Sequence, residues 1–247
     1  MDVVVSINIY KSVKTLEYQL KTIKDHLNVN YVVILNCNKY MRDILVLSKI
    51  KLGENIYLNP ETLEKKRYHG SLTQGIVSNM DYAVKNFDFK YFLVMSGRTI
   101  FYRPINIEKF DDYFKNNKWS SLEEMEADRR GPFPFMGWKW ASFKQTKLAK
   151  YYMDNNYKLT NHLHEGVCFS YNVTKNIVRF LENNLEIAKD LYDFNDCVEE
   201  FSLHVISYNE CDIENLEYGY IYIGNGSVDD CDYTNEDRYT RKILFLN

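Results

Sequence analysis

The chain has 247 residues and a formal net charge of -3. That length suffices for one large domain with a sizeable core. The shares of hydrophobic residues, 45%, and charged residues, 26%, are those of a globular protein and exclude a disordered or fibrous class. Because the small negative charge creates no overall basic field, we expect no nucleic acid partner.

The N-terminus, MDVVVSINIY, has no basic segment before a long apolar run, and no later stretch approaches ~18 uninterrupted apolar residues. We therefore expect no signal peptide, no membrane span and a cytoplasmic location, with peripheral association at the inner face of the membrane left open. His162 and His164 beside Glu165 are the nearest approach to metal-ligand spacing, and we expect no zinc there. The scattered, odd-numbered cysteines predict reduced and mostly buried thiols: Cys37, Cys168, Cys197, Cys211 and Cys231.

Strands and helices alternate along the first half of the chain. Residues 3–9 are rich in β-branched side chains, and apolar residues recur at helical spacing after Ser12. The predicted elements are, in order, strand 3–9, a helix carrying Leu16, Leu20, Ile23 and Leu27, strand 31–35, helix 41–50, strand 56–58, a helix carrying Leu72, Ile76, Met80 and Val84, and strand 90–95. This alternation predicts an α/β fold of Rossmann-like type, with a mainly parallel central sheet and helices on both faces.

Ligands of such sheets bind beyond the carboxyl ends of the strands. Polar residues stand at three of these ends and are our candidates for nucleotide binding: Ser6, Asn8, Asn36, Asn38, Ser96 and Arg98. The first two strands would contact a base and ribose, and the turn at 96–99 would lie near phosphates or a sugar. The alternative is that these residues are simply polar strand ends.

The second half begins with a segment of different composition. Residues 118–144 contain all three tryptophans and two of the four prolines, which predicts a long ordered loop with a function. Trp138 and Trp140 alternate with Lys139, so an extended backbone would turn both indoles to one side, where a sugar ring could pack. Core packing of at least one indole is the alternative. Polar contacts to a sugar acceptor would come from Glu126, Arg129 and Arg130.

Further elements follow that loop. The predicted series is helix 144–154, strand 166–171, helix 174–183, a helix opening near Asn195 with Val198, Phe201 and Val205 as its buried face, and strand 218–223. An acidic segment then precedes a basic end that carries Arg238, Arg241 and Lys242.

Three segments, spread over most of the chain, resemble the core-2/I-branching glycosyltransferases. In residues 68–107 a Gly-Ser segment opens a helix, and a later strand ends in a Ser-Gly turn followed by Arg98. Residues 165–170, EGVCFS, resemble the family's strand before its next helix. Residues 197–203, CVEEFSL, resemble the acidic helix start that carries the catalytic glutamate.

The resemblance implies a GT-A-type single domain over residues 1–247, with a nucleotide-binding half (1–107) and an acceptor and catalytic half (108–247). It implies inverting transfer from a UDP-sugar, GlcNAc among the candidates, to a hydroxyl of a glycan acceptor, without a metal cofactor. Usual GT-A enzymes hold a cation with Asp-x-Asp, whereas Ser96-Gly97-Arg98-Thr99 contains no carboxylate. The family often has Asp where Thr99 stands. The Asn-, Lys- and Tyr-rich composition is that of an AT-rich genome, and we expect a bacterial enzyme of surface polysaccharide synthesis.

By resemblance, Glu200 is the catalytic base and Glu199 the second choice. The family stabilises the leaving diphosphate with a lysine and an arginine that lies upstream of it. Lys242 falls near the family's lysine, whereas the family's arginine aligns near Tyr218. Arg238 or Arg241 would therefore take the role of that arginine. In the alternative interpretation, the glutamates only complement a helix dipole and the basic residues form a solvated tail.

Two other functions stay open. The chain could be a catalytically silent nucleotide- or carbohydrate-binding module that accompanies another transferase, because the positions of Thr99 and Tyr218 differ from the family. It could also be a metal-dependent GT-A transferase that uses Asp229, Asp230 or Asp232.

Overall fold

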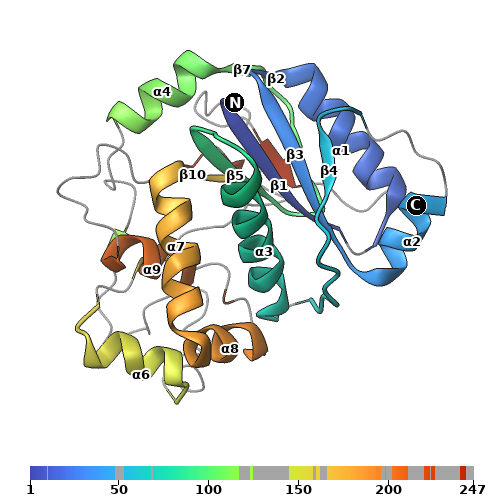
Figure 1. Ribbon diagram of the computed structural model, residues 1–247. Coiled ribbons are helices and arrows are strands. Elements are labelled where there is room, and N and C mark those ends of the chain that lie inside the picture. Colours follow the sequence, from blue (N-terminus) through green and yellow to red (C-terminus); the bar gives the residue numbers. More distant parts are fainter. Residues whose placement is uncertain are drawn as a thin grey trace.

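The computed structural model describes residues 1–9, 11–47, 53–67, 69–116, 123–124, 145–157, 160–161, 166–195, 198, 202–210, 220–222, 224–225 and 240–242. A six-stranded sheet of order β11-β10-β5-β1-β3-β4 lies at its centre (Figure 1). The strands are β1 (Val3–Ile9), β3 (Tyr31–Cys37), β4 (Ile56–Leu58), β5 (Tyr91–Met95), β10 (Val167–Ser170) and β11 (Tyr220–Tyr222).

Neighbouring strands from β4 through β3 and β1 to β5 are parallel, whereas β10 pairs antiparallel with β5 and β11 antiparallel with β10. All seven residues of β1 are buried, as the continuous apolar run of a central parallel strand requires. The predicted α/β fold with a mainly parallel sheet is confirmed. Strands β10 and β11 come from the second half of the sequence, so both halves contribute to one sheet.

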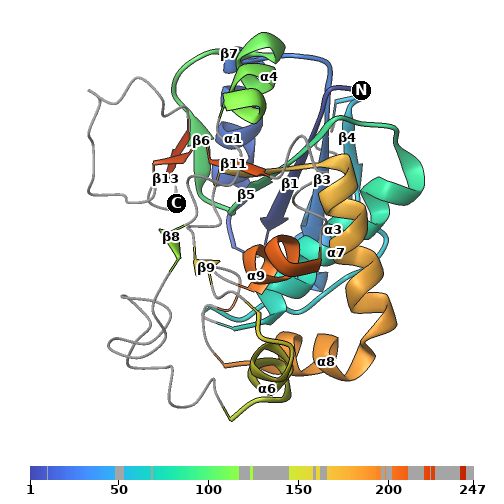
Figure 2. The same ribbon diagram turned by 90° about the vertical axis from the view of Figure 1, so that its left-hand side faces the viewer.

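Helices cover both faces of the sheet (Figures 1 and 2). On one face, Val3 and Val5 belong to a core shared with α1 (Val13–His26), α2 (Lys39–Leu47) and α4 (Ile107–Asn116). On the other, Val4 belongs to a core shared with five helices: α3 (Ser71–Asn86), α6 (Lys147–Asp154), α7 (Tyr171–Asn183), α8 (Leu185–Asp193) and α9 (Ser202–Glu210). The alternation of side chains along a strand produces these two cores.

Within the described residues, three small sheets accompany the central one. They pair β2 (Leu27–Asn28) with β7 (Ile105–Asn106), β8 (Glu123–Glu124) with β9 (Thr160–Asn161), and β12 (Gly224–Asn225) with β13 (Thr240–Lys242), which also pairs with β6 (Thr99–Phe101). The β13–β6 pairing brings a C-terminal segment beside the chain that follows β5 (Figure 2).

Some elements differ from the sequence prediction. Leu27, predicted as the last apolar position of the first helix, has an extended backbone and pairs with Ile105 in the β2–β7 ladder, because α1 already ends at His26. Helices α4 and α8 have no predicted counterpart; they are only ten and nine residues long, which leaves few turns for a periodic pattern. The predicted loop at 118–144 lies outside the described residues except for Glu123 and Glu124.

Candidate functional site at the carboxyl edge of the sheet

The strand order reverses between β1 and β5. From β1 the chain builds outward through β3 and β4, and it then returns to place β5 on the other side of β1. Open α/β sheets bind ligands at such a reversal, outside the carboxyl ends of the strands. A Cβ on Gly97 would lie only 2.8 Å from the backbone oxygen of Asn8, so a glycine is required for the turn after β5 to approach the end of β1 this closely.

The turn at 96–99 is fixed internally and by α1. Ser96 Oγ and Thr99 Oγ1 lie 3.0 Å apart, and the Arg98 backbone N–H donates to Ser96 Oγ at 3.3 Å. The buried Gln19 of α1 donates from Nε2 to the carbonyl of Ser96 at 2.8 Å and to that of Thr99 at 2.7 Å. The turn that carries Arg98 is therefore held in one position at the edge.

Two of the predicted C-terminal cations reach this turn through the backbone. In the antiparallel β13–β6 ladder, Lys242 pairs with Thr99 and Arg241 pairs with Ile100. Their side chains lie outside what the structure describes. The pairing nevertheless brings the backbone of the predicted C-terminal cations beside the turn at 96–99, although the two segments are far apart in the sequence.

The predicted residues of β1 and β3 form a polar layer between the sheet and α3. Asn8 pairs with Asn36 in the parallel ladder. Asn8 Nδ2 donates to the Leu72 carbonyl at 2.8 Å, whereas its buried Oδ1 has no hydrogen-bond partner among the described residues. Ser6 Oγ accepts a hydrogen bond from Asn79 Nδ2 at 3.0 Å. These side chains are almost completely buried, so they support the edge from beneath.

Lys65 also belongs to this layer and is not among the residues that the sequence predicted. It leaves the segment between β4 and α3, is only 9% exposed, and donates from Nζ to Asn36 Oδ1 and, at 3.2 Å, to the Leu63 carbonyl. Burial lowers the pKa of Lys65 to about 8, although the nearby Cys37, Glu64 and Glu61 act in the opposite direction.

A sequence signal for this contact existed in Gly75, an isolated glycine inside a helical pattern. A Cβ at this position would lie 2.4 Å from Asn8 Oδ1 and 2.8 Å from Lys65 Cε. The glycine leaves the space in which the lysine side chain and the Asn8 amide meet α3.

Asn38 has a local structural contact. Its Oδ1 accepts the backbone N–H of Met41 at 3.0 Å at the start of α2, as capping residues do. The remaining predicted site residues lie outside the described residues: Glu199, Glu200, Arg238, Glu126, Arg129, Arg130, Trp138 and Trp140, together with Asp229, Asp230 and Asp232.

Two of the five cysteines lie in the described ranges. Cys37 and Cys168 are buried free thiols, and burial raises the pKa of Cys37 to about 11. No group of three His, Cys, Asp or Glu residues in these ranges is arranged to hold a metal ion.

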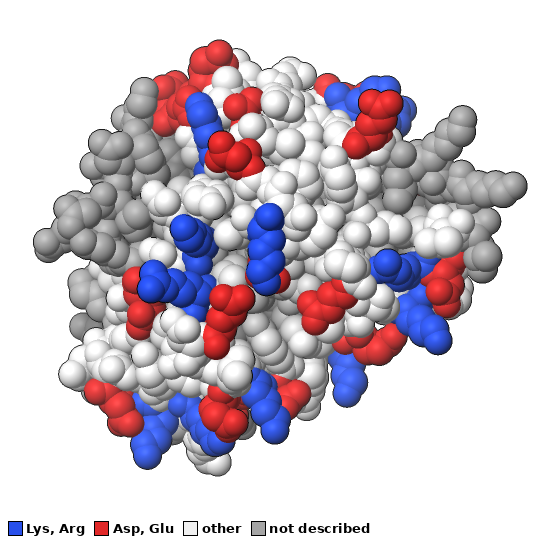
Figure 3. Space-filling view, viewed as in Figure 1, with Lys and Arg blue, Asp and Glu red and all other residues white. Residues whose placement is uncertain are grey.

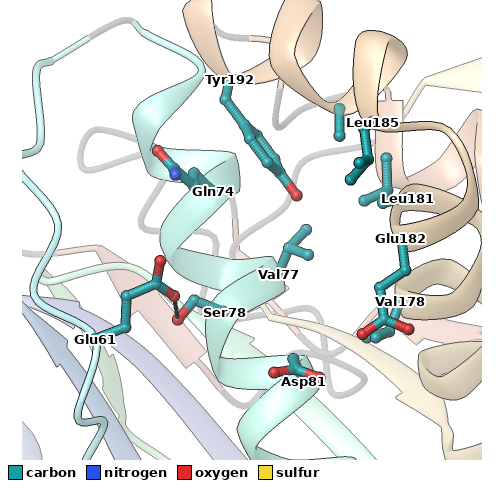
Figure 4. A pocket seen from close by; sticks show the side chains of 11 residues that line it. Glu61, Gln74, Val77, Ser78, Asp81, Val178, Leu181, Glu182, Leu185 and Tyr192 are labelled. Carbon is teal, nitrogen blue, oxygen red and sulfur yellow. Dashed lines mark hydrogen bonds between the residues drawn. The ribbon is translucent and has the colours of Figure 1, made fainter.

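A pocket of about 210 Å³ lies between α3, α7 and α8 (Figure 4). Its walls include the carboxylates of Glu61, Asp81 and Glu182, and the Tyr192 ring extends into it from α8. Burial, and then the charges of Glu61 and Asp81, raise the pKa of the Tyr192 hydroxyl. The negative potential of this pocket disfavours a phosphate, so the carboxyl edge of the sheet is the better site for an anionic ligand.

The face that carries α3 and α7 shows basic and acidic side chains interspersed, with no large area of one sign (Figure 3). Across the described part of the chain, no helix combines the length and apolar character needed to span a bilayer.

Comparison with known proteins yields little. No protein-family model matches this sequence, and no curated protein matches it. Among solved structures the chain is similar to S. aureus TarS, with a TM-score of 0.32 and 15% sequence identity. The match covers 53% of this chain and 23% of TarS, so the chain spans less than a quarter of that protein.

Proposed function

We propose that this protein is an inverting glycosyltransferase of GT-A type that moves a sugar from a UDP-sugar, GlcNAc among the candidates, to a hydroxyl of a glycan without a metal ion. Surface polysaccharide synthesis is the proposed setting. The observation that supports the proposal most is the β13–β6 pairing, which brings the Lys242 backbone beside Thr99, at the turn where the strand order reverses.

The reaction is a single displacement. The acceptor oxygen bonds to the anomeric carbon while the bond from that carbon to the diphosphate oxygen breaks, and the electron pair leaves with the diphosphate. Glu200, with Glu199 as the second choice, takes the proton of the acceptor hydroxyl. Arg98, Lys242 and either Arg238 or Arg241 would stabilise the charge that develops on the leaving diphosphate.

The nucleotide proposal is tested by thermal denaturation of the whole chain with a panel of nucleotides, with and without EDTA. A ligand that binds only the folded state stabilises it by about 2.7 kcal/mol at a hundredfold excess over Kd. We expect stabilisation by UDP that EDTA does not change. Lys242→Met should weaken UDP binding roughly tenfold or more, whereas Lys189→Met, an exposed position on α8, should not. Indifference to every nucleotide would refute this proposal.

Turnover separates an enzyme from a binding module. Glu200→Gln removes the proposed base while keeping nearly the same shape, so we expect transfer to fall by ~10²-fold or more with unchanged UDP binding. A wild-type protein that binds UDP but transfers no sugar from any UDP-sugar would favour the module. Loss of transfer in EDTA would favour a metal-dependent enzyme.

A further inference from the structure

Lys65 is a buried cation that has no anionic partner among the described residues. Its two hydrogen-bond acceptors, Asn36 Oδ1 and the Leu63 carbonyl, are neutral oxygens. It makes no salt bridge with any carboxylate that the structure describes. Burying a charge without a counter-charge is unfavourable by several kcal/mol or leads to loss of the proton.

The surroundings of Lys65 do not explain why the residue must be charged. From α3 it meets Gly75, and Ser78 and Asn79 of that helix join the same polar layer; β1 contributes Asn8. All of these groups are neutral. A neutral donor could bridge to Asn36 equally well, and the glycine that makes room for the lysine weakens α3 relative to alanine.

The charged and titratable groups that act on Lys65 come from its own segment and from β3. Glu61 and Glu64 are exposed, and Glu61 accepts a hydrogen bond from Ser78 Oγ. The Cys37 thiol is buried, and Arg42 of α2 adds a positive charge near that thiol. Because both carboxylates are exposed to water, they compensate the buried ammonium only weakly.

We propose that Lys65 is a positioning residue that acts as the internal counter-charge for the anionic part of a nucleotide bound at the carboxyl ends of β1 and β3. This inference rests on the proposed nucleotide-binding function. The bound anion supplies the negative charge that Lys65 lacks, and charges interact strongly across a site from which water is excluded. Binding therefore favours the protonated amine, and the protein takes up a proton when the nucleotide binds at a pH above the pKa of free Lys65.

The test is calorimetric titration of the whole protein with UDP at pH 8.5 in two buffers of different ionisation enthalpy. With a pKa of about 8 in the free protein, we expect uptake of roughly half a proton or more per UDP bound. Affinity should fall roughly threefold between pH 7.5 and pH 8.5. Lys65→Met keeps the aliphatic length and should abolish both effects, whereas Lys66→Met, at the exposed neighbouring lysine, should keep both.

The outcomes distinguish this inference from the function on which it rests. UDP binding without proton uptake by the wild-type protein, or with uptake retained in Lys65→Met, would overturn the role of Lys65 and leave the nucleotide site standing. Failure of UDP to bind at any pH would remove both. If Lys65→Met does not fold, the wild-type protein still provides a test, because UDP binding without proton uptake overturns the role of Lys65.

Discussion

At the scale of single residues, the polar layer beneath the candidate site requires a glycine at position 75. Gly75 lies in the second turn of α3, inside the helix, where a glycine weakens it. Its missing side chain gives the Asn8 amide and the Lys65 stem their space. The site therefore depends on a residue that has no functional group of its own.

Replacing Gly75 by alanine should destabilise the protein. The new Cβ would approach Asn8 Oδ1 to 2.4 Å and Lys65 Cε to 2.8 Å. We expect a loss of about 1–3 kcal/mol in the free energy of unfolding from this overpacking, partly offset by about 1 kcal/mol from helix propensity. Urea denaturation of the variant and the wild type measures this difference in the free energy of unfolding. Gly53→Ala is the control, because its nearest neighbour is a side-chain atom 3.2 Å away. Equal stability of Gly75→Ala and wild type would mean that both neighbours can move aside.

At the scale of elements, α1 positions the turn that follows β5. The turn is connected to the helix by the two hydrogen bonds of the Gln19 amide, and Thr22 Oγ1 accepts the backbone N–H of Phe101 at 3.3 Å. Both polar side chains are buried on a helix face that hydrophobic periodicity assigns to the core. Their burial is explained by the backbone groups of the turn, which need partners.

Gln19→Leu tests this connection. The change nearly preserves size but removes the Gln19 donor from the carbonyls of Ser96 and Thr99. The Ser96 carbonyl still accepts the Thr99 backbone N–H at 3.1 Å, so we expect a loss of about 1–3 kcal/mol in unfolding free energy. UDP binding should weaken as well, because the turn is no longer held. Gln74→Leu on α3, where the amide makes no hydrogen bond within the described structure, should change stability by less than about 0.5 kcal/mol. Similar losses in the two variants would contradict the assigned role of Gln19.

At the scale of the whole molecule, the buried Lys65 and Cys37 make the free energy of unfolding depend on pH in opposite directions. The folded-state pKa of Lys65, about 8, lies below its ordinary value of 10.5, so between these values the unfolded chain binds more protons and stability rises with pH. The pKa of Cys37 is raised from 9.0 to about 11, so the stability that its buried thiol contributes is lost as pH rises through that interval.

Chemical denaturation between pH 7.5 and pH 9 should therefore show an increase of about 1 kcal/mol in unfolding free energy, before the Cys37 contribution becomes large. Lys65→Met should remove the increase, and Cys37→Ala should extend it to higher pH. A wild-type stability that is constant over this window would show that Lys65 keeps an ordinary proton affinity.

The sequence by itself determined the α/β class, because buried parallel strands and their covering helices carry local patterns that need no partner to be recognised. Strands at 3–9 and 31–35 and the helix through Ile76 are confirmed with small shifts at their ends. It also indicated that polar residues such as Asn8, Asn36 and Ser96 stand at the carboxyl ends of strands.

Only the tertiary structure decided which of those residues meet. The Lys242 and Thr99 backbones pair through a ladder between distant segments, and Lys65 reaches Asn36 across the space left by Gly75. Neither contact leaves a periodic pattern in the sequence, because each depends on how elements far apart in the chain pack together. A buried lysine and an exposed one look alike in a sequence, because burial belongs to the folded chain and not to the residue.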